Sequence, residues 1–79
     1  MSHRTKLRSI VHGIISSSGD GYIAECVEVA VVTQGHTLAK TVHNLQEALT
    51  LHFEGEDLAA IGFSSHPRLR IHFDVPLNL

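Results

Sequence analysis

Cysteine, tryptophan and proline are almost missing from this chain of 79 residues, which holds one cysteine, two prolines and no tryptophan. The lone Cys26 has no partner within the chain for a disulfide, and a single thiol suits a reducing compartment, so we expect a cytoplasmic protein. A domain this small buries only about 60% of its unfolded surface. Association with another chain is therefore the expected source of additional stability.

Charge is also scarce, because charged residues make up 18% of the chain and the net charge is −2. This balance gives no overall attraction to nucleic acid. Hydrophobic residues reach 43%, but no run of them is long enough to span a membrane. Near the N-terminus Arg8 and His12 interrupt the apolar residues, which favours a first strand over an export signal. We expect one soluble domain over residues 1–79, with no separate DNA-binding domain.

The first third of the chain has the residue pattern of strands. Residues 7–15 are mostly aliphatic and are followed by a Ser/Gly/Asp cluster at 16–21, typical of a strand and a hairpin turn. Further strands are predicted over 22–29 and 31–34. Residues 28–30 must bend the chain without Gly or Pro, which predicts a bulge or a wide connection.

At Gly35 the apolar spacing changes to that of a helix. An apolar stripe from Leu38 to Phe53 predicts a helix over 38–55, with Thr37 as its N-cap and Gly55 as its stop. One further helical turn is predicted around 58–61. Residues 69–75 then alternate apolar and polar side chains, which predicts a last strand that ends at Pro76.

These elements predict an α+β domain of order β-β-β-α-β, in which one long helix packs on one face of a four-stranded sheet. Nothing remains to cover the other face, where Ile10, Ile14 and Tyr22 are expected to be exposed. An exposed apolar patch of this kind marks an interface. A homodimer or a tetramer is therefore expected.

The sequence offers little for catalysis. Cys26 lies in the middle of a strand between apolar neighbours, where a buried structural thiol is expected. His12 and His72 are expected to meet on neighbouring strands, but two ligands make a weak metal site. We expect no enzyme activity, no cofactor and no metal, and we keep a metal-assisted hydrolase as an alternative.

Acidic and basic residues occupy different parts of the chain. Acidic side chains gather in the middle, and basic side chains lie near both ends, including Arg4, Lys6, Arg8, Arg68 and Arg70. Direct binding of RNA or DNA by these basic residues is a second alternative, and it predicts salt-dependent binding.

The stretch from Gly21 to Glu54 resembles the HicB-like antitoxin family. It matches the family's strand "G-Y-x-A-E-C", the following "V-T-Q-G-x-T" and the helical "N-L-x-E-A-L-x-L-x-x-E". The principal motif positions are Gly21, Tyr22, Glu25, Cys26, Gln34, Gly35, Thr37, Asn44 and Glu47. The chain departs from the family at Lys40, where an acidic residue is common.

The resemblance implies a short antitoxin that neutralises a small, basic, mRNA-cleaving toxin of the HicA type by covering its active site. An orphan, homo-oligomeric relative whose toxin has been lost is a further alternative. It also implies that Gly35 adopts a backbone conformation costly for other residues. Acidic side chains complement a basic partner, so the candidates for toxin contact are Glu25, Glu28, Glu54, Glu56 and Asp57.

Overall fold

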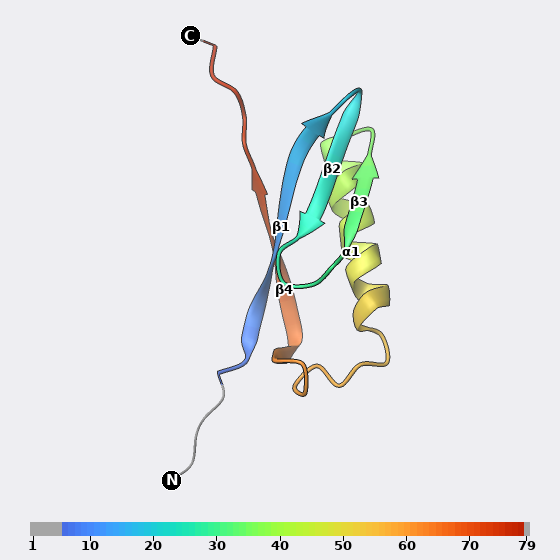
Figure 1. Cartoon of the computed structure of the whole chain (residues 1–79), viewed down its shortest axis with the longest axis vertical. Coiled ribbons are helices and arrows are strands. Elements are labelled where there is room, and N and C mark those ends of the chain that lie inside the picture. The colour runs from blue at the N-terminus through green and yellow to red at the C-terminus, as the bar shows by residue number, and fades with distance from the viewer. Residues whose placement is uncertain (1–5, 79) are drawn as a thin grey trace.

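The computed structural model describes residues 6–78, which form a four-stranded sheet with a helix against one face (Figure 1). The elements are β1 (Arg8–Ser18), β2 (Gly21–Cys26), β3 (Val32–Gly35), α1 (Leu38–Phe53) and β4 (Phe63–Phe73). The strands lie in the order β3-β2-β1-β4, and β1 is antiparallel to β2 but parallel to β4. The predicted α+β class and element order are confirmed.

The core lies between α1 and the sheet. Val11 and Ile15 of β1 are buried on this side, Ala24 pairs with Ile15 from β2, and Leu45 and Leu49 descend from the helix. Every second residue of a strand points to the same face, which explains why Ile10 and Ile14 are excluded from this core. Ile10 and Ile14 thus lie on the face away from the helix, as the sequence predicts.

The boundaries of α1 follow from its caps. The Thr37 hydroxyl accepts a hydrogen bond from the Lys40 amide at 3.0 Å, as an N-cap does. The helix ends at Phe53, two residues earlier than predicted, and Gly55 follows with a φ of +79°. A left-handed glycine at this position stops a helix. Residues 57–62 then form consecutive turns where the sequence predicts a further helical turn.

Several predicted strand boundaries are wrong. The first strand extends to Ser18, so the hairpin turn is confined to residues 19–20, and the last strand ends at Phe73 and not at Pro76. The second strand ends at Cys26 because the chain bends through residues 27–30, as the predicted wide connection requires. The last strand begins at Phe63, six residues earlier than the predicted 69, and contains Pro67. β4 is at the edge of the sheet, where a proline is tolerated because its missing N–H removes no central ladder bond.

We call the side of the sheet away from α1 the open face. Its residues are Ile10, His12 and Ile14 of β1, Ile23 and Glu25 of β2, Val32 and Gln34 of β3, and Arg68, Arg70 and His72 of β4. Tyr22 is not among them, which corrects the prediction. It shares a face with Ala24, is half-buried, and meets the Phe73 ring edge-on at 5.6 Å.

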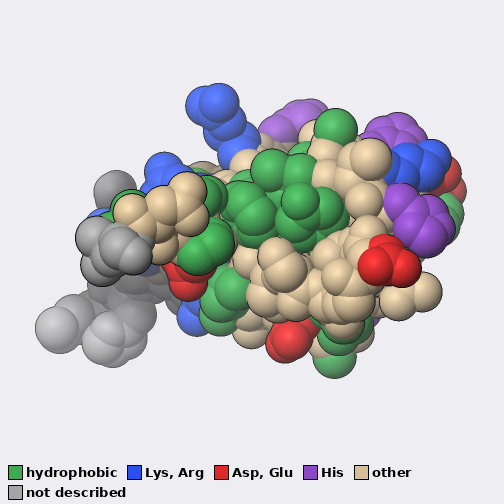
Figure 2. Space-filling view, turned by 90° about the horizontal axis from the view of Figure 1, so that it is seen from above, with side chains coloured by type: hydrophobic (Ala, Val, Ile, Leu, Met, Phe, Trp, Pro, Cys, Tyr) green, Lys and Arg blue, Asp and Glu red, His purple; other side chains and the backbone are tan. Residues whose placement is uncertain are grey.

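Within residues 6–78, no helix is both long enough and apolar enough to cross a membrane. Apolar side chains nevertheless reach the surface, including Ile14, Val32 and Val75. Seen from above, hydrophobic side chains form a continuous patch with histidines and charged residues around it (Figure 2). Such patches are typical of surfaces that another molecule covers.

Candidate functional site

Part of the motif gathers where β3 leads into α1. The motif residues Gly21, Tyr22, Gln34, Gly35 and Asn44 line a shallow pocket of about 370 Å³ there, together with Lys40. The Asn44 side-chain amide donates to the Gln34 carbonyl at 2.8 Å and so ties the helix to the third strand. Together with the Thr37 cap, this bond fixes the direction in which the helix leaves the sheet.

The two glycines of this joint are required by space and not by backbone conformation. Gly35 does not have a positive φ, which corrects the implied strained conformation. A Cβ at Gly35 would lie 2.6 Å from the Thr41 hydroxyl oxygen, and a Cβ at Gly21 would overlap the Gly35 carbonyl oxygen. The helix therefore approaches the sheet more closely here than any larger residue permits.

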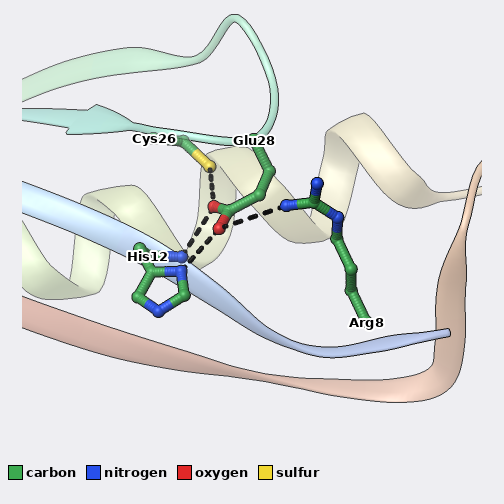
Figure 3. Close-up of polar contacts among 4 residues, drawn as sticks. All are labelled: Arg8, His12, Cys26 and Glu28. Carbon is green, nitrogen blue, oxygen red and sulfur yellow. Dashed lines mark hydrogen bonds and ion pairs between the residues drawn. The ribbon is translucent and has the colours of Figure 1, made fainter. Parts of the chain in front are cut away.

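A second polar cluster lies at the bend after β2, where Glu28 meets His12 (Figure 3). Glu28 Oε1 accepts from the His12 backbone amide at 2.8 Å, and Oε2 lies 2.5 Å from His12 Nδ1. The Cys26 thiol donates to Oε1 at 3.8 Å, and an Arg8 guanidinium nitrogen lies 4.0 Å from Oε2. The Glu28 side chain is only 4% exposed, so this carboxylate is enclosed by its partners.

The backbone explains why a carboxylate is needed at this place. The ladder between β1 and β2 ends at the pair Gly13 and Cys26, and the Val27 amide then donates to the His12 carbonyl. The His12 amide has no strand carbonyl beside it, and Glu28 accepts from it instead. A buried N–H without an acceptor is costly, so Glu28 allows β2 to leave the sheet.

The electrostatics of Glu28 follow from the same contacts. Burial raises the pKa of its carboxyl group, but the hydrogen bonds from the His12 side chain and backbone lower it, and the net pKa lies below its ordinary value of 4.5. Hydrogen bonds to the ionised form favour that form. Glu28 is thus held as a carboxylate.

The acidic contact candidates do not share one surface. Glu25 is exposed on the open face, whereas Glu54, Glu56 and Asp57 are exposed in the segment that follows α1. Glu28 differs from all four because its carboxylate is buried and bonded to His12, and so is not offered to a partner. Glu47 is exposed on the helix, and its Oε2 lies 3.4 Å from His43 Nε2.

The structure does bring His12 and His72 together on the open face, with stacked rings 5.4 Å apart. Within residues 6–78, no group of three or more His, Cys, Asp or Glu side chains is placed to hold a metal ion. Cys26 packs half-buried against the core, next to Glu28 and not to a histidine. The Ser65 hydroxyl lies 3.1 Å from Nδ1 of its exposed sequence neighbour His66.

The parallel pairing of β1 and β4 places the C-terminal basic residues on the open face, whereas Arg8 of β1 pairs with Phe63. Arg68 lies beside Ile10, and Arg70 lies beside His12. Arg4 lies outside the described residues.

The Glu28 and His12 pair is the feature that the sequence did not predict. Its only signal in the sequence is a glutamate in a bend that lacks glycine and proline.

Comparison with known proteins adds no assignment, since no family model, no curated protein and no solved structure matches this chain. Functional interpretation therefore depends on the motif residues and on the surfaces described above.

Proposed function

We propose that this chain is a HicB-like antitoxin module that binds a small HicA-type mRNA-cleaving toxin and covers its active site. The observation that carries the proposal is the motif from Gly21 to Glu54. In this fold the motif glycines, Thr37 and Asn44 all serve the joint between β3 and α1. That common role gives a physical reason for the motif, and it supports a role as a binding scaffold.

The open face is the contact surface that we assign to the toxin. It carries exposed apolar side chains at Ile14 and Val32, and the exposed Glu25 pairs directly with both across the strands. An apolar centre gives affinity, and an adjacent carboxylate attracts a basic RNA-binding surface. Glu54, Glu56 and Asp57 lie in the segment after α1 and are the rival contact residues.

The proposal is tested by co-expression with the product of the adjacent small reading frame, followed by pull-down and a growth assay. Co-purification and rescued growth are the expected results. A neighbouring product that neither binds nor arrests growth would contradict the proposal.

The contact surface is tested by charge reversal. We expect Glu25→Lys to weaken toxin binding by about tenfold or more, because it places a like charge against a basic partner. Glu54→Lys is the matched control, since it reverses a carboxylate that is also exposed but follows the helix. Loss of affinity in the control alone would move the contact to the helix end.

A second candidate function is direct binding of nucleic acid. The observation that favours it is the position of Arg68 and Arg70 beside Ile10 and His12 on the open face. Phosphate contacts from these residues would make binding to RNA or DNA strongly salt-dependent. A gel-shift at low salt that shows no complex with either nucleic acid would end this candidate.

A further inference from the structure

The outer edge of β4 is an unpaired strand edge. β4 is the last strand in the order β3-β2-β1-β4, so within residues 6–78 no strand pairs with its other side. An exposed strand edge as long as that of β4 presents free backbone amides and carbonyls that another strand can bind. Pro67 interrupts the edge and Pro76 follows it, which leaves residues 68–75 free of proline.

The side chains beside this edge are only partly covered. α1 lies behind β2 and β3 and leaves β4 at the far side of the sheet (Figure 1). Leu69, Ile71 and Phe73, on the helix side of β4, are accordingly only half-buried. Between α1 and β4 runs a groove of about 520 Å³ whose lining includes Leu49, Phe53, Ser65, Pro67 and Leu69.

We propose that two copies of this chain join through antiparallel pairing of their β4 edges, about a two-fold axis centred on Ile71. A two-fold axis perpendicular to a sheet keeps each side chain on its own face. An even-numbered residue on one strand therefore faces an even-numbered residue on the other, and an odd-numbered residue faces an odd-numbered one. Only the choice of central residue is left open, and the charges of β4 decide it.

Centring the axis on Ile71 gives two opposite-charge pairs and an apolar centre. Arg68 then faces Asp74 of the second copy, the reverse pair follows by symmetry, Arg70 faces His72, and Ile71 faces itself. An axis on Arg70 would place that arginine against itself. An axis on His72 would pair Arg70 with Asp74, but it would place His72 against itself and leave Arg68 opposite Pro76. Like charges directly opposite each other destabilise a strand pair, whereas opposite charges stabilise it.

The same register also covers the groove. It places Phe73, Val75 and Leu77 of the second copy opposite Leu69, Pro67 and Ser65, which all line the groove. Val75 and Leu77 are 69% and 79% exposed in the single chain. Two independent features, the charge order of β4 and the exposed apolar residues after it, are thus satisfied by one arrangement. The inference does not depend on the proposed antitoxin function.

The charge pair is tested by reversal and rescue. We expect the wild-type chain to dimerise, and Arg68→Glu or Asp74→Arg alone to weaken the dimer about tenfold, because two symmetric pairs change together. The double variant R68E/D74R should recover wild-type association. Both residues are exposed, so the fold is expected to tolerate these changes. Sedimentation velocity over a range of protein concentration measures the dissociation constants.

A control separates the edge from the open face, where Arg68 also lies. Ile14→Lys places a charge in the middle of the open face, beside Glu25. It should leave an edge dimer intact and would break a dimer packed face to face. A monomeric wild type at several hundred micromolar, single variants that dimerise like wild type, a double variant that stays monomeric, or dissociation by Ile14→Lys would each overturn the proposal.

Discussion

At the scale of single residues, Glu28 is the side chain on which the local fold most depends. It replaces a missing strand acceptor for the His12 amide and also binds the His12 ring. We expect Glu28→Gln to lower the free energy of unfolding at neutral pH by about 1–3 kcal/mol, the usual cost of losing a hydrogen bond to a charged group. Chemical denaturation measures this loss, and Glu25→Gln, an exposed carboxylate on the neighbouring strand, should change little.

The pH dependence of this effect has a definite sign. Because the pKa of Glu28 is lowered on folding from 4.5, its contribution to stability is present above that pH and is lost as the pH falls through the folded pKa. The difference between wild type and Glu28→Gln should therefore shrink below about pH 4.5. Thermal unfolding of both proteins from pH 7 to pH 3 would reveal it. A constant difference over that range would contradict the linkage.

Sequence reasoning named Glu28 as a contact candidate but could not find its bond to His12. The expected position of Ile10 and Ile14 on the uncovered face was correct because alternate residues of a strand point to opposite faces. The partner of Glu28 depends instead on where the β1 and β2 ladder stops, and that point is set by the three-dimensional bend at residues 27–30. An acidic residue in a bend is usually solvated, so its enclosure is visible only in the folded chain.

At the scale of elements, α1 has separable capping and interior interactions. Thr37→Ala removes the hydroxyl that accepts from Lys40 N, and we expect it to cost about 1 kcal/mol of stability. Thr50 instead donates to the Gln46 carbonyl within the exposed part of the helix. Thr50→Ala should be neutral or slightly stabilising, since alanine is the better helix former. Equal losses in both variants, measured by urea unfolding, would contradict the capping role.

The elements themselves were largely predictable, but their ends were not. The change from strand to helix periodicity at Gly35 predicted α1 to within two residues, because one apolar stripe of the helix packs against the sheet. β4 was predicted to begin six residues too late because Pro67 predicts a break in the strand. Whether a proline breaks a strand depends on the strand's position in the sheet, which the local sequence does not specify.

At the scale of the whole molecule, the two proposals together determine the composition of the complex. A two-fold axis perpendicular to the sheet leaves the open faces of both copies on the same side, with α1 of each copy on the other. Each open face then remains free for one toxin, so we expect a complex of two antitoxin and two toxin chains. Light scattering of the purified complex measures its mass.

The open-face variant distinguishes the two contacts within that complex. Ile14→Lys should abolish toxin binding while the antitoxin alone stays dimeric, because Ile14 lies on the open face and away from the outer edge of β4. If toxin binding converted the dimer into a complex with one chain of each, toxin and second copy would be competing for one surface. The edge and the open face would then not be independent sites, and the toxin contact would have to include β4.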